Sequence, residues 1–436
     1  MSIPVVTVGQ SREDLVGGLE RLHGPVTVVR RCSELAELLA ACQSGLARAA
    51  VVAEGSDELT ASLVDRLAAV GVVIVALTDS ASETARLTAI GVTAAPAGVD
   101  SAALAGRISG AVDQWSRPKP LQTGDGGFAD TGAALRTQLG AEDDVPAEPS
   151  GAGQLIAVWG PAGSPGRTLV AANMAGELAA AGNSVFLIDA DSYGASVAGL
   201  LGLLDEAAGL AQACRLADLG QLDAGALQKV ATPVALKSGT LRVLTGITRA
   251  DRWTELRASA LGAVFEKARE IADYVVVDTG FCLEADEELS FDTMAPRRNA
   301  ATLRSLELAD TVYAIGSADS IGVPRLVRGL SELEVAVPQA APRVILNKVR
   351  ASAAGRSPER QLRDAWERYG PAAPIAAFLP SDSAASDSAL LSGCLLLEAA
   401  PHSGLRLAIA DLVCAPAQRN RRSSVLSSTA KRRLKG

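Results

Sequence analysis

The chain has 436 residues, 48% of them apolar and 21% charged, which is enough to bury more than one hydrophobic core in two or three domains. Its six cysteines form no C-x-x-C pair, which argues against a disulfide framework and a cysteine zinc site, and its two histidines, His23 and His402, give a histidine-based hydrolase little material. The net charge of −8 argues against a general affinity for nucleic acid.

The first residues, MSIPVVTVGQSRED, contain neither a basic start nor a cleavable apolar segment. No stretch of the chain approaches the ~18 uninterrupted apolar residues of a membrane span. We therefore expect a cytoplasmic protein. Only 3% of the residues are aromatic, whereas Ala and Val are frequent, and this balance favours helices packed on buried parallel strands. The composition thus predicts an α/β fold.

Short apolar runs alternate with amphipathic stretches over residues 1–116. The runs read IPVVTVG, VTVVRR, RAAVVAE, VVIVALTD and TAAPAG. Five βα units in succession predict a doubly wound parallel sheet, because parallel strands need crossover connections that cover both faces. Residues 1–116 therefore resemble a response-regulator receiver domain with a flavodoxin-like fold.

This resemblance concerns the fold alone. A working receiver has an acidic cluster after its first strand, an aspartate at the end of its third and a lysine after its fifth, and these places hold Gly9, Glu54 and Ala95. Thr78 follows the fourth predicted strand, where a receiver keeps a hydroxyl. Without the acids there is no magnesium site for phosphoryl transfer. We predict a degenerate receiver that does not take phosphate.

The remainder of the chain divides into three further segments. Residues 117–152 are rich in Gly, Pro, Asp and Ala without a sustained apolar period, which is typical of a flexible linker. A second βα series occupies residues 153–415 and predicts a larger doubly wound parallel sheet. Residues 416–436 are too polar and basic to add to a core, so we predict a disordered tail.

The segment LIAVWGPAGSPGRTLVAANMAGELAAAG predicts a phosphate-binding loop. It places a buried strand, a Gly-rich turn and an Ala-rich helix in immediate succession. Gly160, Gly163 and Gly166 permit turns in which consecutive N–H groups face an anion at the positive end of the helix. Thr168 would then offer its hydroxyl to magnesium. The pattern G-x-x-x-x-G-K-[ST] is imperfect, since lysine is replaced by Arg167 and the first glycine by Pro161.

Acids follow two further apolar strands. The run SVFLIDADSYG ends in Asp189 and Asp191, and DYVVVDTG ends in Asp278. Acids gathered at the ends of strands need cations, and Asp278 has the place of the acid that holds magnesium through water in phosphate-loop proteins. The competing interpretation is that these are exposed loop acids without a functional role.

In this order the three motifs resemble the MinD/ParA family, including its pilus-assembly relatives CpaE and TadZ. The resemblance covers about residues 154–415 and extends to ILNKV around Asn347 and to AAFLPSDSAASDSALLSGCLLLEAAPHSGL, which in the family packs beside the base.

The resemblance implies binding of ATP and Mg²⁺, with Arg167 in the place of the loop lysine. Asp191 would orient the attacking water, and Asn347 would contact adenine. The implied magnesium site comprises Thr168, Asp189 and Asp278. The implied nucleotide site comprises Gly160, Gly163, Ser164, Gly166, Arg167, Thr168, Leu169, Asn347 and Pro380.

The main departure from the family is Ala162, where its members have a signature lysine that reaches the phosphates of a partner subunit. Such a charge is worth several kcal/mol at a developing transition state if it acts as an arginine finger does. We therefore expect slow hydrolysis, although a nucleotide-dependent homodimer could persist. Arg297 and Arg298 could replace the lysine in trans, or they could pair with Glu287 and Glu288 on a solvated face.

The resemblance leaves several functions open. A receiver-like module before this type of ATPase is the arrangement of CpaE and TadZ, which implies a positioning or assembly factor for pilus or secretion machinery. Septum-site-determining division proteins are close alternatives. A third hypothesis is a dimeric scaffold that no longer hydrolyses ATP, and a metabolic phosphate-loop enzyme is disfavoured because no second substrate site is visible.

The tail adds a question of its own. Seven Lys or Arg and no acid follow Asp411. Basic residues near a membrane attract anionic lipid at ~1 kcal/mol each, which predicts peripheral contact with the inner face of the cell membrane. The apolar face of a helix here would hold only Val425, Leu426, Ala430 and Leu434, too little for firm insertion. A disordered, solubilising tail and nucleic-acid contact stay open as alternatives.

Overall fold

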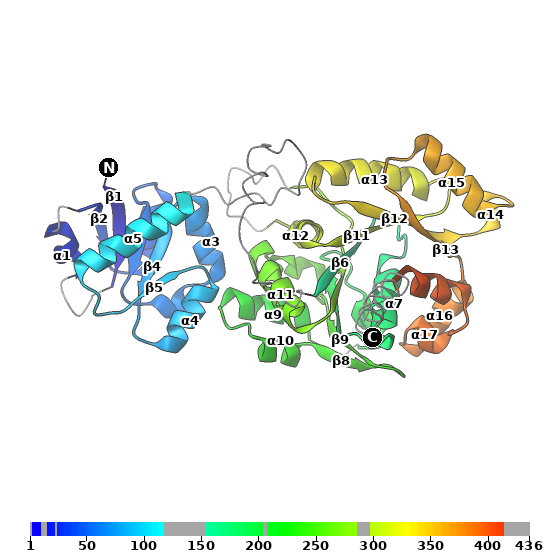
Figure 1. Ribbon diagram of the computed structural model, residues 1–436, viewed down its shortest axis with the longest axis horizontal. Coiled ribbons are helices and arrows are strands. Elements are labelled where there is room, and N and C mark those ends of the chain that lie inside the picture. The colour runs from blue at the N-terminus through cyan, green and yellow to red at the C-terminus, as the bar shows by residue number, and fades with distance from the viewer. Residues whose placement is uncertain are drawn as a thin grey trace, which may run out of the picture. The chain divides into compact units, whose positions relative to one another are not determined.

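The computed structural model describes residues 2–9, 15–21, 24–116, 153–203, 207–285 and 297–413. These residues form two compact units, one before residue 117 and one after residue 152 (Figure 1). The predicted linker and the predicted basic tail lie outside the described residues, as do Glu287 and Glu288. Each unit is described by itself.

The first unit is a five-stranded parallel sheet flanked by helices. Its strands are β1 (Ile3–Val8), β2 (Val26–Cys32), β3 (Ala49–Val52), β4 (Val73–Leu77) and β5 (Thr93–Ala95). Its helices are α1 (Leu15–Arg21), α2 (Leu35–Gln43), η1 (Ser56–Glu58), α3 (Ala61–Ala69), α4 (Ala81–Ala89) and α5 (Ser101–Ser116). The strand order β2-β1-β3-β4-β5 is the flavodoxin-like order, which confirms the predicted fold class of this unit.

The positions compared with a receiver lie where the sequence predicts them. Gly9 follows β1 with φ +83°, and a Cβ there would lie 2.6 Å from the Glu54 backbone nitrogen, so the close approach of the two loops requires glycine. Thr78 follows β4, and its N–H donates to the Ala95 carbonyl. The described part of this unit contains no cluster of three metal-ligating side chains. The absence of a phosphate-accepting role stays a prediction.

The second unit is an eight-stranded sheet. Its strands are β6 (Gln154–Trp159), β7 (Val185–Ala190), β8 (Thr232–Ala235), β9 (Thr240–Leu244), β10 (Tyr274–Thr279), β11 (Thr311–Ser317), β12 (Pro342–Val349) and β13 (Ile375–Pro380). The order is β13-β12-β11-β6-β10-β7-β9-β8, and all neighbours are parallel except β8 and β9. The larger α/β unit predicted from the sequence is thereby confirmed.

The antiparallel edge strand was not part of the sequence prediction. Strands β8 and β9 are joined by a tight turn in which the Leu236 N–H donates to the Gly239 carbonyl at 3.1 Å. Gly239 has φ +107°, and a Cβ there would lie 2.5 Å from the Ala179 carbonyl oxygen. Such a short connection can only join antiparallel strands, because parallel strands need a longer crossover.

Helices cover both faces of the second sheet. They are α7 (Arg167–Ala180), α8 (Val197–Leu200), α9 (Gly209–Asp218), α10 (Ala224–Val230), η2 (Ala250–Glu255), α11 (Ala258–Ile271), α12 (Ala300–Leu308), α13 (Gly322–Ala336), α14 (Ala351–Ala354), α15 (Pro358–Tyr369), α16 (Ser383–Ser392), α17 (Leu396–Ala399) and helical residues 404–413. Because side chains alternate along a strand, Ile156 and Val158 pack with α7, whereas Leu155 packs with α9 and α11 and Trp159 with α13.

Helix α7, which follows the predicted phosphate loop, is deeply buried. All of its residues from Val170 to Ala179 are buried, and α16, α17 and residues 404–413 cover it on the side away from the sheet (Figure 1). Asn173 accepts a hydrogen bond from the Leu396 N–H at 2.7 Å, and Glu177 forms a bidentate pair with Arg406 at 2.6 and 2.7 Å. The C-terminal segment therefore fixes the helix that carries the predicted phosphate loop.

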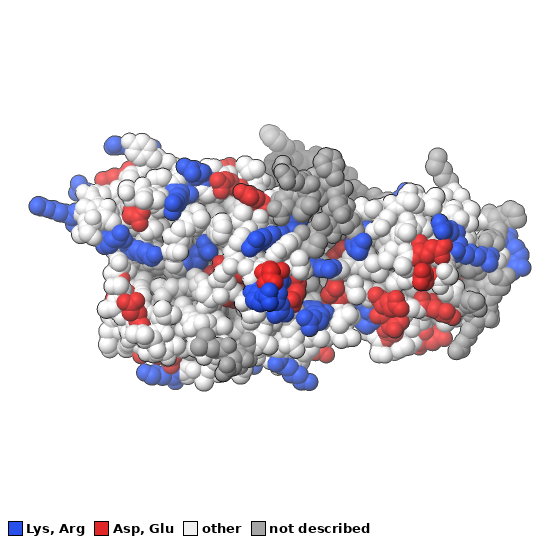
Figure 2. Space-filling model, turned by 180° about the vertical axis from the view of Figure 1, so that it is seen from behind, with Lys and Arg blue, Asp and Glu red and all other residues white. Residues whose placement is uncertain are grey.

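Two surface properties bear on partners. No helix among the described residues has the length and apolar character needed to cross a membrane. Figure 2 shows basic side chains scattered among acidic ones over the second unit, rather than gathered into one basic patch on the face that it presents. The expectation that nucleic acid is not a general partner stays a prediction.

Candidate functional site

The predicted phosphate loop connects the central strand β6 to the N-terminus of α7. Glycines are needed at three places along it. A Cβ on Gly160 would lie 2.3 Å from the Ile315 carbonyl oxygen, and Gly163 and Gly166 have φ +114° and +96°. Gly166 caps α7, so the helix begins directly after the loop. Its free N–H groups and the positive end of its dipole make this turn an anion site.

Arg167 and Thr168 are the first two residues of α7. The Arg167 guanidinium turns back over the loop, where it donates to the Gly160 carbonyl at 2.9 Å and to Asp191 Oδ2 at 3.2 Å. Only 13% of the Arg167 side chain and 7% of the Asp191 side chain are exposed. Arg167 is therefore paired, inside the site itself, with the acid that is predicted to orient the attacking water.

Asp189 lies near the end of β7, Asp191 directly follows the strand, and both hold the loop that follows it. Asp189 Oδ2 accepts from the Ser196 and Val197 N–H groups at 2.9 Å, and Asp191 Oδ1 accepts from Tyr193 and Gly194. Burial raises the pKa of Asp189 to about 6, although these amides oppose the rise. Asp189 thus has a structural function in addition to its predicted contact with metal.

Asp278 lies at the centre of the site and is fully buried. It ends β10, between β6 and β7, in register with Val158 on one side and Asp189 on the other. Neither of its carboxylate oxygens has a hydrogen-bond partner among the described residues. Burial raises its pKa well above the usual range and the charge of Asp189 adds to the rise. The Thr168 hydroxyl, which faces Asp278 outside ordinary hydrogen-bond geometry, and the positive charge of Arg167 oppose the rise.

Asn347, predicted to contact adenine, lies behind the loop. Its side chain is 3% exposed and its Nδ2 donates to the Pro165 carbonyl at 2.8 Å, while Oδ1 accepts from the Lys348 N–H. The Lys348 ammonium donates to the Ser164 carbonyl at 2.7 Å. Lys348 and Ser164 are the two described non-glycine residues with positive φ, +59° and +53°. The sequence analysis did not identify Lys348, whose contact joins residues 184 positions apart.

The remaining predicted residues lie at the edges of the site. Leu169 packs against the core that contains α7. Pro380 ends β13 and pairs in register with Val349 of β12, beside the strand that carries Asn347. The structure places Gly160, Gly163, Gly166, Arg167, Thr168, Asp189, Asp191 and Asp278 around one turn, with Asn347 supporting it.

Arg298 lies near the loop after β7 rather than on an open face. Its guanidinium carbon is 4.1 Å from the centre of the Tyr193 ring, whose hydroxyl donates to Asn299 Oδ1 at 2.8 Å. Tyr193 in turn contacts Phe281 after β10. The predicted pairing with Glu287 and Glu288 falls outside the described residues. Arg298 therefore supports the segment that follows Asp191.

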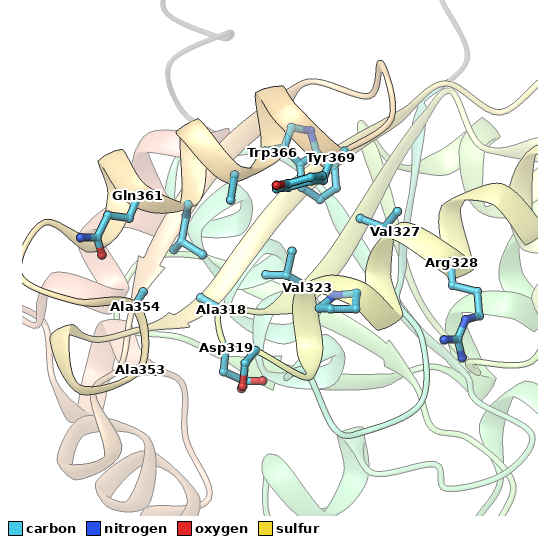
Figure 3. Close-up of a pocket in the computed structure, with 15 residues that line it drawn as sticks. Ala318, Asp319, Val323, Val327, Arg328, Ala353, Ala354, Gln361, Trp366 and Tyr369 are labelled. Carbon is cyan, nitrogen blue, oxygen red and sulfur yellow. The ribbon is translucent and has the colours of Figure 1, made fainter.

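Among the described residues, two of the cavities in the second unit border α13. One, of about 210 Å³, lies between the phosphate loop and the start of α13, and is lined by Ala162, Gly163, Asp319 and Arg325 among others. The other, of about 600 Å³, lies between α13 and α15. Figure 3 shows Val323 and Val327 from α13 and Trp366 and Tyr369 from α15 around it. The larger cavity is apolar and holds none of the predicted nucleotide-site residues.

A Gly-rich turn at a helix N-terminus, set at the end of a central parallel strand with acids on the neighbouring strands, defines a phosphate-loop nucleotide-binding protein. The family model described as the CobQ/CobB/MinD/ParA nucleotide binding domain matches residues 156–391, more than half of the chain. The chain belongs to this family. No match was found among curated proteins.

Solved structures share the fold of the second unit. A ParA family ATPase from Chlorobium tepidum is 19% identical, with a TM-score of 0.50, over 60% of this chain and 99% of its own. The cell division ATPase MinD of Pyrococcus furiosus is 18% identical, with a TM-score of 0.47, over 61% and 99%. The septum site-determining protein MinD of Pyrococcus horikoshii, in complex with Mg-ADP, is 17% identical, with a TM-score of 0.46, over 60% and 94%.

Proposed function

We propose that the chain binds ATP with Mg²⁺ at the turn from Gly160 to Thr168 and acts as a slow nucleotide-dependent switch. The observation that carries the proposal is Asp278, a carboxylate that is fully buried and lacks any hydrogen-bond partner among the described residues. A buried polar group without a partner is unfavourable by several kcal/mol when charged. A cation beside Asp278 would remove that penalty.

The residues around Asp278 fit magnesium better than a metal held by protein alone. No group of three His, Cys, Asp or Glu able to hold a metal occurs among the described residues. Mg²⁺ usually keeps several waters and takes one or two protein ligands together with substrate phosphates. The Thr168 hydroxyl and Asp278, directly or through water, would supply the protein's share. When bound, the ion would neutralise charge on the phosphates.

The contact between Arg167 and Asp191 supports slow turnover. Asp191 is the residue predicted to orient the attacking water, yet one of its oxygens accepts from Arg167 and the other from two backbone N–H groups. Arg167 would have to turn toward the phosphates before Asp191 could act on water. Ala162 supplies no lysine for a partner subunit, so this route to transition-state stabilisation is missing as well.

The biological role that we propose is positioning or assembly of pilus or secretion machinery in the cytoplasm, through a nucleotide-dependent homodimer that recruits a protein partner. The support for this role is the five-stranded unit that precedes the nucleotide-binding unit in the chain, because a receiver-like module before the ATPase is the arrangement of the pilus-assembly relatives. A septum-site-determining role in division is the alternative. Peripheral contact with the membrane through the basic tail belongs to the same proposal.

A binding experiment tests the nucleotide site. We expect the purified full-length protein to bind ATP measurably more tightly with Mg²⁺ than with EDTA. Asp278→Asn should remove most of that difference, roughly tenfold in affinity if one charged contact to the hydrated ion is lost. Asp251→Asn, at an exposed acid paired with Arg249, is the matched control and should behave as wild type. Absence of ATP binding in the presence of Mg²⁺ would overturn the proposal.

The second candidate function is a scaffold that binds nucleotide without hydrolysing it. The ion pair between Arg167 and Asp191 favours this candidate, because Asp191, the residue predicted to orient the attacking water, is already bound to Arg167. Asp191→Ala separates the two in cells through a fluorescent fusion. A scaffold should keep its localisation, whereas a hydrolytic switch should lose its cycling. A diffuse wild-type signal at neither pili nor division sites would contradict both positioning roles.

A further inference from the structure

The cations around the phosphate loop differ in how they are engaged. Arg167 donates to Gly160 and Asp191, and Lys348 donates to the Ser164 carbonyl. Each of these two cations thus already has an acceptor within the site. A third cation, Arg325, borders the same loop and makes no side-chain hydrogen bond or ion pair within the part of the chain that the structure describes.

Arg325 reaches the loop through the space that a glycine leaves. It lies in the first turn of α13, where its N–H donates to the Ile321 carbonyl at 3.2 Å. Its Nη1 is 2.6 Å from the point where a Cβ on Gly163 would stand, and its Cζ is 3.7 Å from that point. Any side chain at residue 163 would displace the guanidinium. Gly163 is therefore needed for this contact as well as for its φ of +114°.

The turn that carries Arg325 is held in place by Asp319. Asp319 Oδ1 accepts from the Ile321 and Gly322 N–H groups at 3.0 and 2.7 Å, and Oδ2 accepts from the Ser317 hydroxyl at 2.7 Å. These bonds occupy the one acid that lines the cavity of about 210 Å³ together with Arg325. The guanidinium consequently faces the loop without a carboxylate partner of its own.

The missing lysine and the added arginine are adjacent. Ala162 precedes Gly163, over which the Arg325 guanidinium lies, and both residues line the same cavity. We propose that Arg325 is a phosphate-contacting residue, supplied by the same chain, that takes over part of the charge which a lysine at position 162 would provide. This inference rests on the proposed binding of ATP. Arginine suits the role because its planar fork binds two phosphate oxygens at once.

The test compares Arg325→Gln with Arg328→Gln in the full-length protein. Arg328 lies one turn along the same helix but borders the larger apolar cavity (Figure 3), so it controls for the loss of a charge on α13. We expect Arg325→Gln to bind Mg-ATP about tenfold more weakly, the effect of one charge-assisted contact, and AMP with nearly wild-type affinity. Arg328→Gln should bind both nucleotides as wild type does, and circular dichroism should be unchanged in both variants.

A double variant that moves the positive charge from residue 325 to residue 162 completes the test. Adding Ala162→Lys to Arg325→Gln should restore most of the lost affinity for Mg-ATP. Wild-type affinity in Arg325→Gln, or equal losses in the Arg325 and Arg328 variants, would overturn the inference while leaving the proposed function intact. Absence of Mg-ATP binding by the wild-type protein would instead refute the proposed function, and the inference with it.

Discussion

Arg167 donates a hydrogen bond of 3.2 Å to Asp191, so the loop cation and the predicted water-orienting acid hold each other within the site. A second contact, to the Gly160 carbonyl at 2.9 Å, ties the same guanidinium to the start of the loop. The arrangement depends on the length and width of arginine, because a single ammonium on a shorter stem could not satisfy both acceptors as well. A lysine at residue 167 would therefore hold Asp191 and the Gly160 carbonyl less firmly than Arg167 does.

The first prediction concerns this contact. Arg167→Lys should weaken the hold on Asp191 and raise the rate of ATP hydrolysis about fivefold, equivalent to roughly 1 kcal/mol for a partly screened ion pair. The measurement is steady-state phosphate release with saturating Mg-ATP. Arg252→Lys, at a surface pair with Glu255, is the control and should leave the rate unchanged. A rate equal to wild type or lower in Arg167→Lys would show that the contact does not limit turnover.

The second prediction concerns pH. The pKa of Asp189 is raised from 3.8 to about 6 by burial, and that of Asp278 is raised well above 3.8 for the same reason. The charge of Asp191 adds to both rises, whereas Arg167 opposes the rise at Asp278. The native protein then binds protons more tightly than the unfolded chain. Without metal or nucleotide, its free energy of unfolding should therefore fall as pH rises from about 4 through 6, by up to about 1.4 kcal/mol per pH unit for each group.

Chemical denaturation in EDTA across that pH range measures the effect. Asp278→Asn removes one titrating group, so its free energy of unfolding should fall less steeply with pH than that of the wild type. Saturating Mg-ATP should flatten the wild-type dependence in the same way if a cation compensates Asp278. Identical pH slopes for the wild type and Asp278→Asn would contradict the role given to this buried carboxylate.

Much of the site could be predicted because it follows from strand ends. In a parallel sheet the carboxyl ends of neighbouring strands lie at one edge, so Gly160, Asp189 and Asp278, each just past or at the end of a buried apolar run, meet without further information. Apolar runs that alternate with amphipathic stretches likewise predicted both α/β units. The sequence pattern thus predicted the α/β class of both units and the position of the Gly-rich turn after β6.

Other parts depended on contacts that no local pattern reports. Lys348, which has a φ of +59°, meets the Ser164 carbonyl 184 positions away, and Arg325 meets Gly163 across more than 160 residues. The structure shows the Asn347 amide supporting the loop, which the sequence did not indicate, and its contact with adenine stays a prediction from family resemblance. The antiparallel β8 escaped prediction because its exposed, alternating residues resemble a loop as much as an edge strand.

The third prediction concerns the cover on α7. Arg406→Ala should lower the free energy of unfolding by about 2–4 kcal/mol, because it leaves Glu177 charged, 4% exposed and without its bidentate partner. Urea denaturation measures this loss, with Arg304→Ala at a surface pair as the control. Adding Glu177→Gln to Arg406→Ala should recover part of the stability. No recovery would mean that Arg406 acts mainly through packing.

The fourth prediction separates two functions of Asn347. Its Nδ2 donates to the Pro165 carbonyl and its Oδ1 accepts from the Lys348 N–H, so both ends of the amide already have partners. If Asn347 only supports the loop, Asn347→Ala should lower the affinities for Mg-ATP and Mg-GTP by the same factor, roughly tenfold, and lower the free energy of unfolding by about 1–2 kcal/mol.

Lys348→Ala is the companion variant, because it removes a more exposed contact to the same loop, at the Ser164 carbonyl. It should weaken binding of both nucleotides less than Asn347→Ala does, since an exposed hydrogen bond contributes less than a buried one. An amide that also reads adenine would give a different result: Asn347→Ala would then lose affinity for Mg-ATP selectively, while its affinity for Mg-GTP would change little. Titrations of both nucleotides into both variants distinguish these outcomes, because support of the loop acts on the phosphates that ATP and GTP share.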